Sequence, residues 1–219
     1  MTYETIFRSR HRMPRTQGSA SHHIRAISEV TQSARRHGGE AWLWGGWAMD
    51  FVVGRVTREH SGVDFFVDHR YLDAVVADLV FNGWIVRNPA RAHIQAHLSR
   101  RRVDLYLTPI AHRDLHRPHV PVGPWAGTPW PDTALTDAHD VTLGGVGAKC
   151  ISVDAQIECK ERIPGWTGRA VRDKDLADLV VLRGLSRDMN RVEYSASQGD
   201  VTTCQTSAAG AVVAAGEYA

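Results

Sequence analysis

Cysteine is scarce in this sequence of 219 residues, and its three cysteines, Cys150, Cys159 and Cys204, form no C-x-x-C pair. An odd number of widely spaced cysteines argues against a disulfide framework and favours a reducing compartment. The sequence also lacks an apolar run of the roughly 18 to 20 residues that span a bilayer. Its first residues, MTYETIFRSRHRMPRTQ, contain no apolar segment typical of a secretory signal. We therefore expect a cytoplasmic protein with no membrane partner.

A charge excess of one sign is missing as well. The chain has 26 Lys and Arg against 24 Asp and Glu, a net charge of +2, so nothing indicates a dedicated nucleic-acid-binding protein. A hydrophobic content of 43% and a charged content of 23% are ordinary for a globular protein. A chain of this length buries a sizeable core without disulfides or a structural metal.

The sequence divides into three parts. Residues 1–20 are polar and basic and predict a flexible arm, residues 21–187 predict one domain, and the Ser-, Thr-, Gly- and Ala-rich residues 188–219 predict a disordered tail. Residues 109–146, rich in Pro, Gly, Trp and His, are expected to form a long loop region. Apolar periodicity predicts helices over 21–38, 47–53, 71–81, from 152 onward and 173–185, and strands over 41–44, 63–67, 84–86, 92–98, 102–107 and 149–151. This order predicts an α+β domain with helical cover.

The stretch WGGWAMDFVVGRVTREHSGVDFFV over residues 44–67 carries the clearest chemical signal. A short strand ends at Gly45-Gly46 and a helix follows at once, which presents backbone N–H groups and a positive helix end to a phosphate. Double glycines usually only make turns, so the pair alone is weak evidence. Arg58 beside it and Asp64 on the next strand strengthen the interpretation, because arginine binds phosphate oxygens and a carboxylate binds Mg²⁺.

GGWAMDFVVGRVTREH followed by a strand with an aspartate resembles the small antibiotic nucleotidyltransferases, the aminoglycoside and lincosamide adenylyltransferases of the polymerase-beta-like superfamily. Two later segments support the resemblance. CISVDAQ over 150–156 is similar to the family's C-x-S-x-E-A-Q, with Asp for Glu, and RDKDLADL over 172–179 is similar to its R-x-K-D-x-x-D-L. The resemblance covers about residues 22–185.

This resemblance implies a nucleotidyltransferase-type mixed β-sheet with flanking helices and a helical C-terminal portion. It also implies transfer of a nucleoside monophosphate from an NTP such as ATP to a hydroxyl of a small antibiotic-like molecule, with Mg²⁺ as cofactor. The positions that match the nucleotide site are Gly45, Gly46 and Arg58. Lys174, at the start of the R-x-K-D helix, either reaches a phosphate or is an ordinary surface lysine. The resemblance assigns Asp64 as the second metal aspartate. Asp104 is a looser match to the third acid, which completes the metal site or activates the acceptor hydroxyl.

Gly62 departs from the family pattern, because it stands where the first metal-binding aspartate is expected. Residues 62 and 64 of a strand point the same way and lie about 6.6 Å apart, so two aspartates there would share a metal site. Asp68 has the same parity but lies roughly 13 Å from Asp64 along the strand. The site therefore loses one carboxylate, and with it several kcal/mol of transition-state stabilisation.

That loss leaves other readings open. His93 and His97 share a strand face, with Asp104 opposite, and either form an ordinary hydrogen-bonded pair or line a pocket with acid–base chemistry. In the alternative reading, the fold has lost its metal site and serves nucleotide-independent small-molecule chemistry. In a third, the protein only binds a small molecule. Trp125 and Trp130 either pack their loop against the core or stack on a planar ligand. The histidines of HRDLHRPH, over residues 112–119, only weakly indicate a zinc site. The sequence leaves a monomer and a homodimer equally open.

Overall fold

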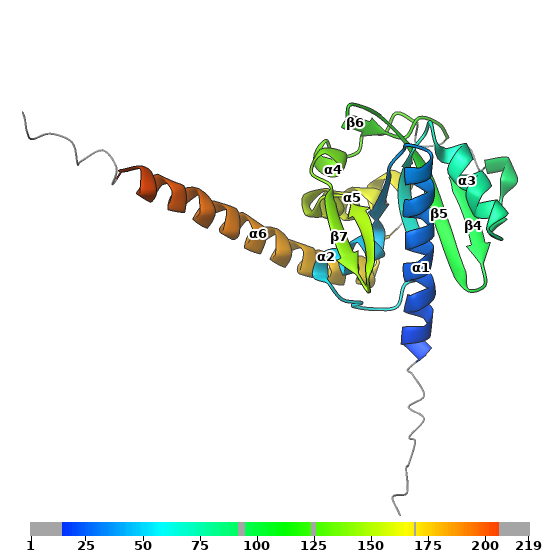
Figure 1. The fold of residues 1–219 in the computed structure, drawn as a ribbon, viewed down its shortest axis with the longest axis horizontal. Helices are drawn as coiled ribbons and strands as arrows, with labels where there is room; N and C mark the ends of the chain where they lie inside the picture. The colour runs from blue at the N-terminus through cyan, green and yellow to red at the C-terminus, as the bar shows by residue number, and fades with distance from the viewer. Residues whose placement is uncertain (1–14, 92–94, 124–125, 169, 206–219) are drawn as a thin grey trace, which may run out of the picture.

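One mixed sheet forms the framework of the domain (Figure 1). The computed structural model describes residues 15–91, 95–123, 126–168 and 170–205. The strands lie in the order β3-β4-β5-β2-β1-β8-β7, and β6 pairs with β5. They are β1 Ala41–Trp44, β2 Val63–Asp68, β3 Ile85–Val86, β4 Ala96–Arg100, β5 Val103–Arg113, β6 His116–His119, β7 His139–Leu143 and β8 Val146–Cys150. The pairs β1–β8 and β2–β5 are parallel and the others antiparallel, so the predicted α+β fold with a mixed sheet is confirmed.

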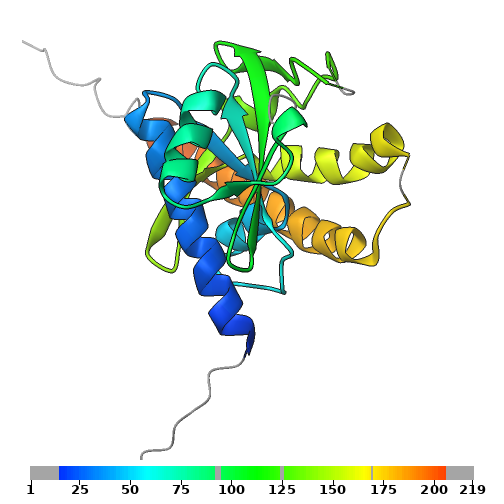
Figure 2. The ribbon, with the colours of Figure 1, turned by 90° about the vertical axis from the view of Figure 1, so that its right-hand side faces the viewer.

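Helices cover the sheet on both faces. They are α1 Arg15–Arg36, α2 Gly45–Val53, α3 Leu72–Phe81, α4 Thr133–Thr136, α5 Val153–Thr167 and α6 Asp173–Gln205, with a 3₁₀ turn over Pro89–Arg91. Apolar residues of α1 and α3, such as Ile27 and Val75, are buried with the strands in the main core. Helices α5 and α6 pack together on the other side, and α6 then extends away from the sheet (Figures 1 and 2). Within the described residues, no helix combines the length and apolarity needed to cross a membrane.

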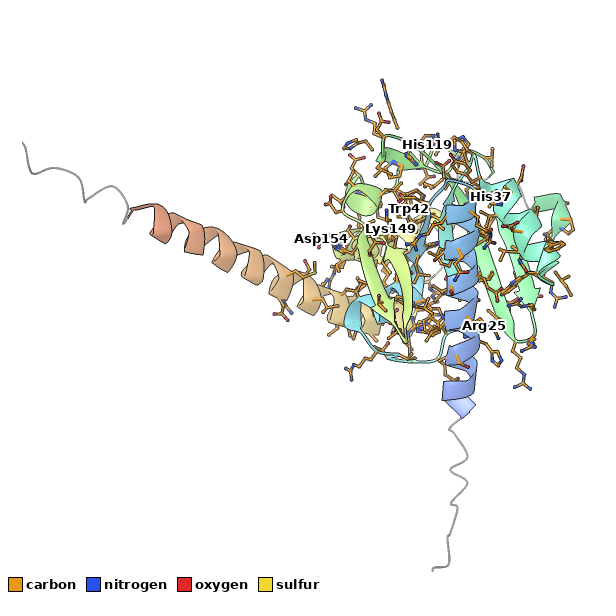
Figure 3. The ribbon with its side chains drawn as sticks, viewed as in Figure 1. Arg25, His37, Trp42, His119, Lys149 and Asp154 are labelled. Atoms are coloured by element: carbon orange, nitrogen blue, oxygen red, sulfur yellow. The ribbon has the colours of Figure 1, made fainter. Side chains whose placement is uncertain are left out.

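Alternation along β2 directs one aspartate away from the core. Val63, Phe65 and Val67 are fully buried in the main core. Asp64 and Phe66 point to the opposite face because successive strand residues alternate. Phe66 packs there in a second cluster, with Trp42 and Trp130 among its members, and Figure 3 places Trp42 in the interior of the fold. Asp64 is thus presented beside an aromatic cluster rather than to open solvent.

The expectation of a long loop over 109–146 is wrong. Strand β5 continues to Arg113, turns at Asp114-Leu115, and returns as β6, while β7 and β8 form a second hairpin. The first turn has positive φ at Asp114 and Leu115, which no glycine marks in the sequence. Three of the four residues of the short edge strand β6 are at least partly exposed, so it carries no apolar alternation. His119, near the end of this hairpin (Figure 3), hydrogen-bonds the Arg117 carbonyl.

The structure also revises the expected ends of the domain. Helix α1 begins at Arg15, inside the segment expected as a flexible arm, and residues 1–14 lie outside the described residues. Helix α6 continues to Gln205, inside the segment expected as a disordered tail, and residues 206–219 lie outside the described residues. Once a packed first part is formed, adding each further residue to a helix needs no new nucleation.

Candidate active site

The glycine turn between β1 and α2 requires glycine at both positions. Gly45 has φ +75°, and a Cβ there would lie 2.9 Å from Asp64 Oδ2. A Cβ at Gly46 would lie 2.4 Å from His60 Nδ1 and 2.7 Å from Arg58 Nη2. Helix α2 begins at Gly45 and has no side-chain cap or acidic residue in its first turn. Its first N–H groups therefore keep their capacity to bind an anion.

A buried carboxylate, Asp50, holds the segment GRVTREH over residues 54–60 in place. Asp50, on α2, is fully buried. Its Oδ1 accepts hydrogen bonds from the Thr57 amide at 3.2 Å and from the Thr57 hydroxyl, and its Oδ2 lies 2.6 Å from His60 Nε2. Asp50 thereby fixes the loop that follows α2 and places His60 against the glycine turn. Our sequence reasoning missed Asp50, Thr57 and His60, although all three lie inside the motif.

Among the described residues, four lysine and arginine side chains line the cavity next to this turn, and three of them are engaged by carboxylates. Arg58 donates to Asp178 through Nε at 3.0 Å and Nη2 at 2.7 Å. Lys160 donates to the same carboxylate at 2.7 Å, and Arg172 donates to Asp175 at 2.6 Å. Burial alone would raise the pKa of Asp178, but the hydrogen bonds from Arg58 and Lys160 outweigh it and lower that pKa. Asp175 and Asp178 of α6 thus hold these three cations in place.

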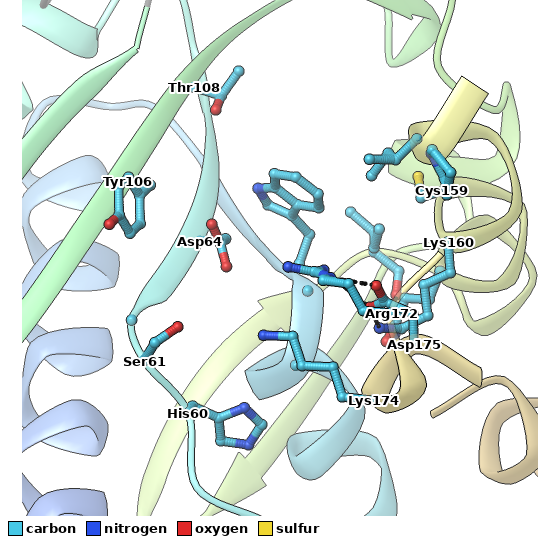
Figure 4. Close-up of a pocket in the computed structure, with 18 of the residues that line it drawn as sticks. His60, Ser61, Asp64, Tyr106, Thr108, Cys159, Lys160, Arg172, Lys174 and Asp175 are labelled. Carbon is cyan, nitrogen blue, oxygen red and sulfur yellow. Dashed lines mark hydrogen bonds and ion pairs between the residues drawn. The ribbon is translucent and has the colours of Figure 1, made fainter. Parts of the chain in front are cut away.

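Lys174, the fourth cation, is different. The described residues give it no hydrogen bond or ion pair, and it lines the cavity from the start of α6. Burial lowers its pKa, as do the charges of Arg172 and Arg58. Figure 4 shows its ammonium group directed into the space in front of Asp64. An unpaired cation beside other cations is the arrangement that an anionic ligand would stabilise.

Asp64 is the anionic counterpart of Lys174 in this cavity. None of the described residues forms a hydrogen bond or ion pair with its carboxylate, and burial raises its pKa to about 6, although Lys174, Arg172 and Lys160 act to lower it. Among the described residues, no group of three His, Cys, Asp or Glu side chains is placed to hold a metal ion. The protein therefore offers one carboxylate at this position and not a preformed metal cage.

The space that a first metal aspartate would need is filled. A Cβ at Gly62 would lie 2.9 Å from Tyr106 Cε2 and 3.0 Å from the Asp104 carbonyl oxygen. Tyr106 lies opposite Asp64 in the parallel register of β2 and β5. Burial raises the pKa of its phenol, and the charges of Asp104 and Asp64 raise it further. The Tyr106 ring, and not a carboxylate, thus borders Asp64 on this side.

Asp104 lies behind Tyr106 with His97. His97 Nε2 is 2.8 Å from Asp104 Oδ1, and the His97 ring stacks on Tyr106 with centroids 4.6 Å apart. The side chains of His97 and Asp104 are 31% and 41% exposed, so solvent reaches both. Neither residue belongs to the lining of the cavity.

These residues surround a cavity of about 630 Å³ between the sheet and helices α5 and α6 (Figure 4). The structure brings together five of the predicted site residues in its lining: Gly45, Gly46, Arg58, Asp64 and Lys174. It places Asp104 and His97 together just outside the lining. His93 and Trp125 lie outside the described residues. The remaining wall is neutral, with Trp44, Trp130 and α5 side chains.

Comparison with known proteins agrees with this geometry. The sequence profile of the aminoglycoside-2''-adenylyltransferase family matches residues 26–182. The chain belongs to this family. Membership in the aminoglycoside-2''-adenylyltransferase family confirms the predicted resemblance and an enzyme of the nucleotidyltransferase type, and it does not favour the repurposed alternative. No curated protein matches the chain by sequence.

Solved structures of similar fold include members of the same family. The solution structure of the antibiotic-resistance factor ANT(2'')-Ia has a TM-score of 0.60 at 16% identity, covering 86% of this chain and 97% of that chain. Its crystal structure in complex with adenylyl-2''-tobramycin has a TM-score of 0.59 at 18% identity, covering 81% and 98%. The lincomycin-bound lincosamide adenylyltransferase LnuA has a TM-score of 0.53 at 19% identity, covering 68% and 89%. These likenesses establish the fold.

Proposed function

We propose that this protein transfers a nucleoside monophosphate from a nucleoside triphosphate, ATP in the first instance, to a hydroxyl group of a small antibiotic-like molecule. One observation supports this above the others. The cation Lys174 and the carboxylate Asp64, neither of which has a partner among the described residues, face one cavity beside the Gly45-Gly46 turn. An isolated cation and an isolated carboxylate suit a triphosphate that arrives with a divalent metal.

In this proposal the triphosphate binds at the glycine turn. The first N–H groups of α2 bind phosphate oxygens, and the absence of a Cβ at residues 45 and 46 allows the close approach. Lys174 donates to the same oxygens and balances the charge that moves onto the departing pyrophosphate. Arg58 acts as a positioning residue, because its hydrogen bonds go to Asp178, the Glu59 carbonyl and His60.

The donor set fits one Mg²⁺ bound together with the nucleotide, since Mg²⁺ commonly uses one or two carboxylates plus substrate phosphates. Asp64 would hold the ion, which would neutralise phosphate charge and polarise the reacting phosphorus centre. Asp104 is hydrogen-bonded to His97 and lies outside the cavity lining, so this proposal gives it no contact with the acceptor hydroxyl.

Calorimetric titration with a non-hydrolysable ATP analogue, with and without Mg²⁺, tests the proposal. We expect saturable binding that requires Mg²⁺ and weakens about tenfold or more in Lys174→Ala, the loss typical of a charged hydrogen bond. Arg187→Ala, which removes an exposed cation elsewhere on α6, is the matched control and should bind as the wild type does. A folded protein that binds no analogue with Mg²⁺ present would exclude nucleotidyl transfer.

A further inference from the structure

His60 lies at the edge of the cavity, and the proposed function leaves it without a role. Its side chain is only 3% exposed, and it lines the cavity together with Lys174 (Figure 4). A Cβ at Gly46 would clash with His60 Nδ1 and Cε1, so the imidazole packs directly against the start of α2. A change at this ring would therefore displace the glycine turn, where the triphosphate is proposed to bind.

Both ring nitrogens of His60 have partners. Nε2 lies 2.6 Å from Asp50 Oδ2, and Nδ1 lies 2.9 Å from Arg58 Nη1. The other oxygen of Asp50 accepts hydrogen bonds from the amide and the hydroxyl of Thr57. The Trp47 ring packs against the imidazole with centroids 4.7 Å apart. The imidazole is thus held by two side chains of α2 and by one side chain of the loop that follows α2.

These partners determine where the imidazole proton lies. A guanidinium group only donates hydrogen bonds, so His60 Nδ1 accepts from Arg58 and carries no proton. Asp50 accepts from Thr57 through its other oxygen, as a carboxylate does, so Nε2 carries the proton and donates it to Asp50. A doubly protonated ring would instead direct an N–H group of His60 at an N–H group of Arg58. The contacts are therefore satisfied by the neutral ring with its proton on Nε2.

Arg58 depends on this acceptor for its orientation. Its Nε and Nη2 donate to Asp178, and its Nη1 donates to the Glu59 carbonyl and to His60. These bonds use four of the five N–H groups of the guanidinium, and the fifth, on Nη2, has no acceptor among the described residues. Nη2 would lie 2.7 Å from a Cβ at Gly46. His60 and Asp178 together thus hold the remaining donor of Arg58 beside the glycine turn.

We propose that His60 is a positioning residue for nucleotide binding, which joins the buried Asp50 to Arg58 as a neutral imidazole and fixes the guanidinium at the glycine turn. This inference rests on the proposed function for the identity of the ligand at the turn. The hydrogen bond to Asp50 stabilises the loop after α2, whereas the hydrogen bond from Arg58 serves the ligand. The two ring nitrogens therefore have separate roles, which can be tested separately.

Two substitutions of His60 each keep one of these roles. In His60→Asn the side-chain oxygen takes the place of Nδ1 and accepts from Arg58, but the shorter side chain does not reach Asp50. In His60→Gln the amide group takes the place of Nε2 and donates to Asp50, but no acceptor remains for Arg58. Urea denaturation should show that His60→Asn is less stable than His60→Gln, because His60→Asn leaves a buried carboxylate oxygen without its donor.

Calorimetric titration with the non-hydrolysable ATP analogue and Mg²⁺ should rank the same variants in the opposite order. We expect His60→Asn to bind within about threefold of the wild type and His60→Gln to bind about tenfold more weakly, the loss typical of a charged hydrogen bond. His22→Asn and His22→Gln make the same changes at an exposed histidine of α1 and should alter neither stability nor binding. Any other order of affinities at His60, equal affinities included, overturns the proposal.

Nuclear magnetic resonance locates the proton without any ligand. Spectra of protein with isotope-labelled histidine, recorded at about pH 7, distinguish the two neutral forms of the ring from the charged form, and the His60 signals are those that His60→Asn lacks. A proton on Nε2 alone is expected, and a proton on Nδ1 contradicts the proposal. If the wild type binds no ATP analogue, the proposed function fails and this role of His60 fails with it. If the wild type binds but the variants do not rank as expected, only the role of His60 fails.

Discussion

Gly62 illustrates how one position determines what a site can hold. The Tyr106 ring and the Asp104 carbonyl leave no room for a side chain there. The position at which the sequence analysis expects a metal-binding aspartate is therefore closed by packing in the structure. Restoring the carboxylate alone would not restore the environment that a metal aspartate needs.

We predict that Gly62→Asp destabilises the fold by about 1 to 3 kcal/mol, the usual cost of overpacking a tight site, without tightening Mg²⁺-dependent nucleotide binding. The double variant Gly62→Asp/Tyr106→Ala should bind the ATP analogue at lower Mg²⁺ concentration than Tyr106→Ala does. Urea denaturation and calorimetry measure these effects. Tighter Mg²⁺-dependent binding by the single variant at unchanged stability would show that Tyr106 is not the obstacle.

The buried carboxyl group of Asp64 should make the free energy of unfolding depend on pH when no metal is bound. Burial raises its pKa from 3.8 to about 6, so the folded protein holds this proton more tightly than the unfolded chain does. As pH rises from about 4 to 7, the unfolded chain loses the proton first, and the contribution of Asp64 to stability falls. Asp64→Asn removes this dependence.

We therefore expect Asp64→Asn to gain stability relative to the wild type between pH 4 and pH 7. Urea denaturation in EDTA at both pH values measures the difference. The exposed Asp188→Asn is the control, and its difference from the wild type should stay nearly constant. A stability difference for Asp64→Asn that shrinks as pH rises would contradict the assigned direction of the pKa.

Helix α6 positions Arg58 beside the glycine turn through Asp178, which lies far from Arg58 in the sequence. Asp178 is 2% exposed and joins Arg58, beside the turn, to Lys160 on α5. We predict that Asp178→Asn destabilises the protein by about 3 kcal/mol, because it leaves Arg58 without its buried carboxylate partner and leaves Lys160 with only Asp175, at 3.4 Å. The exposed pair Arg183–Glu161 is the comparison, and Arg183→Ala should cost less than about 1 kcal/mol.

The same Asp178 variant should weaken binding of the ATP analogue, since Arg58 packs against Gly46. Chemical denaturation and calorimetry on each variant check both effects. If Asp178→Asn and Arg183→Ala lower the free energy of unfolding by the same amount, α6 does not stabilise the glycine turn as described.

Elements with regular patterning could be predicted from the sequence, and those shaped by distant contacts could not. Strands β1 and β2 stand out as apolar segments next to glycines, and the Gly45-Gly46 turn with Asp64 follows from them. The β5–β6 hairpin has an exposed edge strand and a turn without glycine, so no local signal marks it. The site shows the same division. Lys174 and Asp64 line the same cavity, but the closure of Tyr106 over Gly62 depends on the register of β2 and β5.

The whole molecule consists of a packed domain and the long helix α6, whose described side chains contact that domain near the start of the helix. Leu182 of α6 is fully buried in a small core with Met49 and Val153. Ser186 donates a hydrogen bond to Asp154 of α5 at 2.8 Å, and Met189 is already 37% exposed. The contacts of α6 with the domain, as far as the side chains are described, thus come from its first part.

We therefore predict that a chain ending at Met189 keeps its unfolding free energy within about 0.5 kcal/mol and binds the ATP analogue unchanged, because the described contacts of α6 with the domain lie within the retained part. A chain ending at Val181 also loses Leu182, and should be destabilised by about 2 to 5 kcal/mol or more, as for truncation of a buried leucine. Urea denaturation of both chains measures this contrast. Equal destabilisation by the two truncations would mean that the distal part of α6 belongs to the folding unit, and that the boundary lies beyond residue 189.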